Sequence, residues 1–100
     1  MRDIIVTIPK NKLAEVEAEE LDVAIRQEKG EFDIEYYWEM GRVPKELPRR
    51  IYFVWNDAIR AYHEVTRMNS NAVFMSATIY LVNPPISMKA FRGFRYAKNL

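Results

Sequence analysis

Cysteine is absent from this 100-residue chain, histidine occurs once and glycine three times. The lack of cysteine excludes disulfides, thiolate metal sites and a cysteine nucleophile. A single imidazole without thiolates is a poor basis for a zinc site, and three glycines leave no glycine-rich loop to cradle phosphates. We therefore expect no metal and no cofactor, and the sequence does not favour an enzyme.

Long apolar segments are also missing. The apolar run within the N-terminal MRDIIVTIPK is too short for a signal peptide or a membrane span. Together with the absence of cysteine, this predicts a cytoplasmic protein with no membrane association. The length and the 49% hydrophobic and 29% charged composition predict one globular domain over residues 1–100.

The charges that are present are unevenly distributed. Residues 1–40 carry 11 acidic and 5 basic residues, a balance of −6, whereas residues 41–100 carry 3 acidic and 10 basic residues, a balance of +7. Such asymmetry is typical of a chain with an anionic partner. It is equally compatible with two halves that neutralise each other within a small fold.

Residues 50–68 carry the clearest structural pattern. Aromatic and β-branched residues alternate with others on both sides of Asn56-Asp57, which predicts two strands. Asn and Asp tolerate positive φ, so this pair predicts the two-residue turn of a hairpin. His63 shares a face with Ile59 and Val65, and we expect it to be buried in the core or at a barrel mouth.

Further elements are predicted around this hairpin. Strands are expected at residues 3–8, 31–40 and 73–82, the last stopped by Pro84 and Pro85, and a proline-containing loop at residues 41–49. Between the first two strands, residues 11–29 predict a helix with an Asn11 N-cap and Gly30 at its C-terminal end. The set predicts an α+β fold, a small mixed or antiparallel barrel of five or more strands packed with one main N-terminal helix.

The predicted helix has two kinds of surface. Four apolar residues recur at helical spacing along one face, Ala14, Ala18, Leu21 and Ile25, with Leu13 and Val16 alongside. Four acidic residues crowd its early turns, Glu15, Glu17, Glu19 and Glu20. We interpret the acidic face as solvated, because these carboxylates have no accompanying histidine.

The first candidate binding stretch surrounds Trp38. Tyr37 and Trp38 precede a loop that carries Arg42 and Lys45. Stacking rings beside cations are the combination that single-stranded nucleic-acid binding uses. The alternative is structural, with Trp38 filling the end of a barrel and the basic residues simply solvated.

The second candidate stretch is the C-terminal FRGFRY, which contributes Arg92 and Arg95. A guanidinium group can pair with phosphate or stack on a base. We expect Phe91 and Phe94 to anchor this segment in the core, which leaves the role of the arginines open.

In its order of elements and in the central PRRIYFVWNDAIRAYHEV, the chain resembles the PUA-like β-barrel superfamily, which includes the PUA, ASCH, EVE and YTH domains. Ile59, Ala61 and Val65 are similar to the pattern "I-x-G/A-x-x-x-V" in the second strand of the hairpin. The ASCH group is marked by Gly-x-Lys-x-x-Glu-x-Arg. Here the Gly and Glu are present as Gly30 and Glu35, while Phe32 and Tyr37 stand in place of the Lys and Arg.

The resemblance implies binding of RNA, or of a modified base in RNA or DNA, in a cleft between the helix and the barrel. It also implies aromatic side chains around the base, for which Tyr36, Tyr37, Trp38 and Trp55 are candidates. Two alternatives stay open. One is a small ASCH-type ribonuclease, and the other is a protein-interaction adaptor or subunit with no nucleic-acid role.

Overall fold

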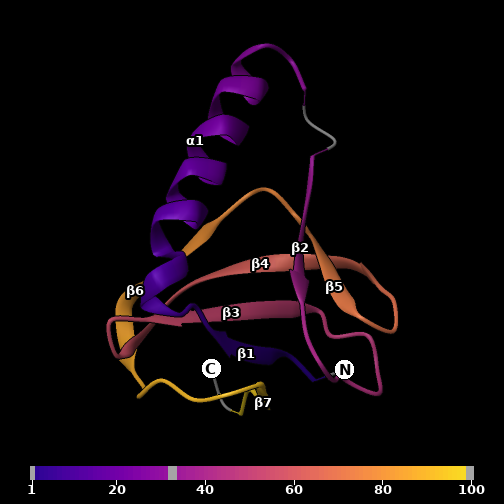
Figure 1. Ribbon diagram of the computed structural model, residues 1–100, viewed down its shortest axis with the longest axis vertical. Helices are drawn as coiled ribbons and strands as arrows, with labels where there is room; N and C mark the ends of the chain where they lie inside the picture. The colour runs from indigo at the N-terminus through magenta and orange to yellow at the C-terminus, as the bar shows by residue number, and fades with distance from the viewer. Residues whose placement is uncertain (1, 32–33, 99–100) are drawn as a thin grey trace.

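The computed structural model describes residues 2–31 and 34–98 (Figure 1). A 3-10 turn, η1 (Lys10–Lys12), leads into the single α-helix of these residues, α1 (Leu13–Glu28). The strands of the described residues are β1 (Ile4–Thr7), β2 (Glu35–Glu39), β3 (Arg50–Trp55), β4 (Ala58–Met68), β5 (Ala72–Ser76), β6 (Tyr80–Ser87) and β7 (Phe94–Tyr96).

The strands form one mixed sheet with two free ends. Its path runs β2-β5-β4-β3-β1-β7, and β6 pairs with β4. The β1–β3 pair is parallel and the other pairs are antiparallel. The predicted α+β class, with one main helix and five or more strands, is confirmed. The sheet does not close on itself within the described residues, so the predicted barrel is not confirmed.

The central hairpin forms as its sequence predicts. Asn56 and Asp57 have φ values of 49° and 58°, the left-handed conformation that a tight hairpin turn requires. Strand β3 is buried on both faces. On one face Ile51 and Phe53 pack in a cluster with β1, and on the other face Tyr52 packs in a second cluster. Two small cores therefore lie on opposite sides of β3.

The strand predicted at residues 73–82 is interrupted. Strands β5 and β6 both follow one edge of β4, antiparallel to it, with a break at residues 77–79. At this break the Ser76 carbonyl accepts a hydrogen bond from the His63 ring, and the Ala77 amide donates to Ile34. These groups are therefore not available to the β4 ladder.

The predicted stop at Pro84 and Pro85 is wrong, since both residues lie inside β6. Among the described residues β6 pairs only with β4. Its other edge needs no ladder hydrogen bonds, and proline is tolerated on such an edge strand.

The helix prediction is correct in extent and wrong in two details. Helix α1 is preceded by η1, and the capping residue is Lys12, with no side-chain cap hydrogen bond, instead of Asn11. The buried side is also different. Val23 is the buried residue of α1. The four main residues of the predicted apolar face, Ala14, Ala18, Leu21 and Ile25, are exposed, whereas Leu13 and Val16, predicted alongside them, are half-buried.

Helix α1 leans away from the sheet, as Figure 1 shows, with its C-terminal half standing clear of β3 and β4. Near its start, Leu13 and Val16 pack against the cluster that contains Phe53. Farther along, Val23 packs with Ile34 and Ala77. The space under the helix, between these contacts, is where the candidate site lies.

Candidate binding site

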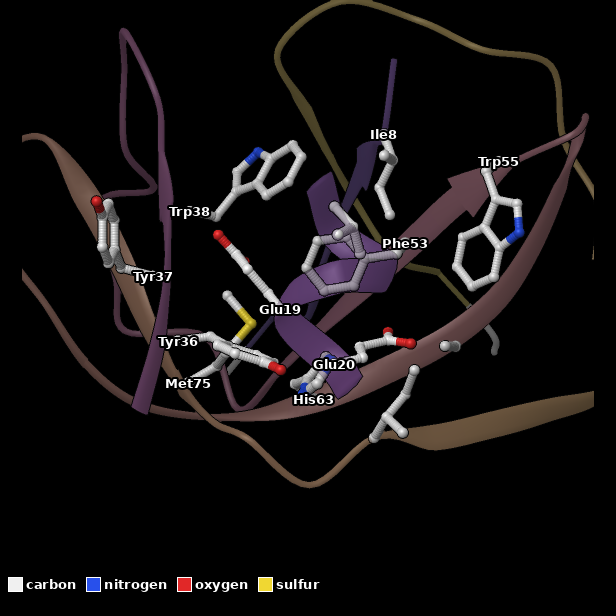
Figure 2. A pocket seen from close by; sticks show the side chains of 13 residues that line it. Ile8, Glu19, Glu20, Tyr36, Tyr37, Trp38, Phe53, Trp55, His63 and Met75 are labelled. Atoms are coloured by element: carbon white, nitrogen blue, oxygen red, sulfur yellow. The ribbon is translucent and has the colours of Figure 1, made fainter. Parts of the chain in front are cut away.

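A cavity lies between α1 and the sheet (Figure 2). The residues that define it here are four aromatic side chains, the single histidine and two helix carboxylates, namely Tyr36, Trp38, Phe53, Trp55, His63, Glu19 and Glu20. We call this the aromatic cavity. The space open to the centres of water molecules is about 50 Å³, which is room for roughly three to five waters.

The rings of the aromatic cavity hold one another edge to face. Trp38 and Phe53 have centroids 5.4 Å apart, Phe53 and His63 5.6 Å, and Tyr36 and His63 5.7 Å, with interplanar angles of 71° to 89°. Edge-to-face pairs are favourable for aromatic rings. These contacts fix the orientations of the four rings that make them, and none of the three pairs is stacked. The four rings are those of Tyr36, Trp38, Phe53 and His63.

His63 is buried and neutral. Its side chain is 5% exposed, and Nδ1 lies 2.8 Å from the Ser76 carbonyl oxygen. Since a carbonyl only accepts, Nδ1 is the nitrogen that carries the proton. Burial lowers the pKa of His63, and hydrogen bonds to the Ser76 and Thr78 backbone oppose that shift. The cavity thus has no imidazolium charge at neutral pH, and its burial confirms the sequence expectation for His63.

The Tyr36 hydroxyl is the unusual polar group of the cavity. Its oxygen is buried and has no hydrogen-bond partner among the described residues. Burial first, and then the carboxylates of Glu20, Glu19 and Asp22, raise the pKa of Tyr36 to about 12. The hydroxyl is therefore protonated at neutral pH and is able to donate to a ligand.

A second hollow, the basic groove, shares Trp38 with the aromatic cavity. The residues that define it here are Lys12, Trp38, Arg42, Phe91, Arg92 and Phe94. The space in this groove that is open to the centres of water molecules is about 610 Å³. Glu39 also lines the groove. The Arg42 guanidinium carbon lies 5.7 Å from the centre of the Phe94 ring. Cations from three distant parts of the chain thus share one hollow with aromatic side chains.

The C-terminal segment is attached to β1, which completes the basic groove. The Phe91 amide donates to Thr7 Oγ1 at 3.2 Å, and the Ala97 amide donates to the Asp3 carbonyl at 2.8 Å. Phe91 and Phe94 are half-buried, each against a different core cluster. They anchor the segment, but both lie at the edge of a cluster and not in the core as expected, and Arg92 is left exposed at the groove.

The six predicted site residues are only partly gathered. Trp38, Arg42 and Arg92 lie together in the basic groove. Tyr37 lines the aromatic cavity but is 62% exposed and packs on Phe74 across the β2–β5 pair, with centroids 6.0 Å apart.

The other two predicted residues lie outside the basic groove. Arg95 lies over the Phe91 ring, 4.3 Å from its centre. Lys45 is exposed and lines neither hollow.

Sequence reasoning missed Lys12, Glu19 and Glu20 as site residues. No sequence pattern marks Lys12 as a binding residue, and it lies in the groove only because the fold brings it there. The two glutamates were assigned to a solvated face, although they lie between Val16 and Val23 at the spacing of one helical face. The available signal was the position of both glutamates on the same helical face as Val16, which is half-buried, and Val23, which is buried.

Comparison with known proteins gives no relative, since no family model, curated protein or solved structure matches the chain. No helix in the described part of the chain is long and apolar enough to cross a membrane. Within residues 2–31 and 34–98, no three or more His, Asp or Glu side chains converge to hold a metal ion.

Proposed function

We propose that this chain is a PUA-like domain that binds single-stranded RNA, or a modified base in RNA or DNA. The observation that carries this proposal is the position of Trp38, which lines both the aromatic cavity and the basic groove. A base next to Trp38 lies beside rings on which it can stack, and its phosphates lie beside cations. This pairing of a stacking surface with a positively charged groove is how single-stranded nucleic acids are bound.

Charge gives the two hollows different roles. The basic groove is lined by Lys12, Arg42 and Arg92 against one carboxylate, Glu39. The aromatic cavity is lined by Glu19 and Glu20 and by no lysine or arginine of the described residues. Phosphate is therefore favoured in the groove and disfavoured in the cavity, which leaves the cavity to the uncharged base.

The salt dependence of RNA binding tests this assignment. Each phosphate neutralised on a single strand contributes about −0.7 to the slope of log affinity against log salt. Three cations in the groove give a slope of about −2, which is roughly a 20-fold loss of affinity between about 50 and 200 mM salt. The double variant Arg42→Gln/Arg92→Gln leaves one cation, and we expect a loss of roughly threefold over the same range.

A charge-matched control separates the groove from the net charge. Lys45→Gln/Lys89→Gln removes two positive charges from exposed residues that do not line the groove, and we expect it to keep the wild-type slope. Equal slopes for the two double variants would refute the assigned surface. Cleavage of the labelled RNA during the titration would favour the ribonuclease alternative, and association that is insensitive to salt would favour the adaptor.

A further inference from the structure

We infer that the aromatic cavity prefers a base that N-methylation has made positively charged, such as 1-methyladenine or 3-methylcytosine, over an uncharged base. The preference rests on the proposed function for its nucleic-acid context. It concerns the cavity alone, and the basic groove has no part in it. The carrying observation is that aromatic rings line the cavity together with two carboxylates and with no lysine or arginine of the described residues.

The rings supply the first part of the preference. Three ring pairs among the side chains of the cavity meet edge to face, so no ring in these pairs is covered by a parallel neighbour. The face of an aromatic ring is electron-rich, and a cation within about 6 Å of its centre is attracted to it, most strongly at tryptophan. Trp38 and Trp55 both line the cavity. Their indole N–H groups lie at the ring edges and leave the attraction of the faces in place.

Two carboxylates of α1 supply the second part. Glu19 is exposed and Glu20 is half-buried, and Figure 2 shows both side chains extending from the helix toward the rings. Their charge acts inside the cavity, because these carboxylates and that of Asp22, after burial, raise the pKa of Tyr36. His63 is neutral, so it does not oppose this charge. The same carboxylates that disfavour phosphate in the cavity therefore attract a cationic base.

The size of the cavity fits the methylated edge of a base and not a whole nucleotide. The space open to the centres of water molecules is about 50 Å³, which is room for roughly three to five waters. In 1-methyladenine and 3-methylcytosine the methyl group and the positive charge lie on the same edge of the ring, away from the sugar. This edge brings the charge to the aromatic rings, while the sugar and phosphate stay outside, beside Trp38, which also lines the basic groove.

Binding of free nucleosides tests the preference separately from the groove, because nucleosides carry no phosphate. The experiment measures, at neutral pH, quenching of tryptophan fluorescence by two pairs of methylated isomers, 1-methyladenosine with N6-methyladenosine and 3-methylcytidine with 5-methylcytidine. Each member of a pair carries one methyl group, and only the first member is cationic. We expect the cationic member of each pair to bind about tenfold more tightly.

Variants connect this preference to the named side chains. Glu19→Gln/Glu20→Gln removes both carboxylates, and the affinity ratio within each pair should fall by about threefold or more. Trp55→Leu keeps an apolar side chain without a ring face, and should weaken binding of the cationic member more than binding of its isomer. The control Glu28→Gln/Glu46→Gln removes two exposed carboxylates outside the cavity and should keep the wild-type ratios.

Each outcome decides one proposal. Equal affinity within both pairs, tighter binding of the neutral isomers, or no nucleoside binding up to millimolar concentration would overturn the inference, and so would wild-type ratios in Glu19→Gln/Glu20→Gln. Salt-dependent RNA binding that is lost in Arg42→Gln/Arg92→Gln would still support the proposed function in any of these cases. Conversely, selective nucleoside binding without RNA binding would keep the cavity inference and refute the groove.

Discussion

Acidification should destabilise this protein through His63. The side chain is buried, and burial lowers its pKa in the folded state below the ordinary value. The unfolded chain therefore binds a proton at a higher pH than the folded chain does. The contribution of the neutral ring to the free energy of unfolding is fully present above the unfolded pKa of about 6.5, and it decreases as the pH falls below that value. His63 is the single histidine of the sequence, so no other imidazole contributes.

The size of the effect follows from proton linkage. If the folded ring stays neutral, lowering the pH from about 7 to about 5.5 removes at most about 1.2 kcal/mol of unfolding free energy. Glu20 opposes this change. Burial, and then Glu17, raise the pKa of Glu20, so protonation of Glu20 favours the folded state as the pH falls. In Glu20→Gln the loss should therefore be closer to the full value.

Urea unfolding followed by tryptophan fluorescence, at constant ionic strength and several pH values between about 5.5 and 7, measures this loss. His63→Gln keeps an amide that can donate to the Ser76 carbonyl but cannot titrate. We expect it to be less stable than wild type at neutral pH and to lack the pH dependence. If His63→Gln and wild type lost equal stability, or if Glu20→Gln lost none, the argument from the buried ring would be refuted.

Two further substitutions test the packing. Ile59 is fully buried between β3 and β6, and Ile59→Ala should lower the unfolding free energy by roughly 2–5 kcal/mol. The control Leu81→Ala, at a side chain that is 73% exposed, should change it by less than about 0.5 kcal/mol. Tyr36→Phe removes a buried hydroxyl that has no partner among the described residues, so its urea midpoint should equal or exceed that of wild type. A clear loss in Tyr36→Phe would mean that the hydroxyl is satisfied in solution.

The features that sequence predicted correctly are local ones. The β3–β4 hairpin depends on alternation within two short segments and on two residues that tolerate positive φ, and all of this information is contiguous. Gly30 ends the helix region with a φ of 90° for the same kind of local reason. The burial of His63 followed from its strand parity with Ile59.

The wrong predictions, for the buried face of α1 and for an unbroken strand at residues 73–82, have a common physical cause. In both, the residue whose contact determines the structure is distant in the sequence. Helical spacing supports two faces on α1, and the choice between Leu21 and Val23 is made by Ile34 and Ala77, which pack on Val23. The interruption after β5 likewise depends on His63, which occupies the Ser76 carbonyl. Neither contact has a signal in the sequence near the residues that it affects.

The uneven charge of the sequence acquires a spatial meaning around Trp38. Glu19 and Glu20 of α1 line the aromatic cavity together with Trp38, and Lys12, Arg42 and Arg92 line the basic groove together with the same residue. Lys12 belongs to the acidic half of the sequence but lies with Arg42 and Arg92, because the C-terminal segment attaches to β1. An approaching polyanion would be repelled by the helix and attracted by the groove. Under the proposed function, the acidic half therefore orients the ligand, directing phosphates to the groove and leaving the base as the part that faces the cavity.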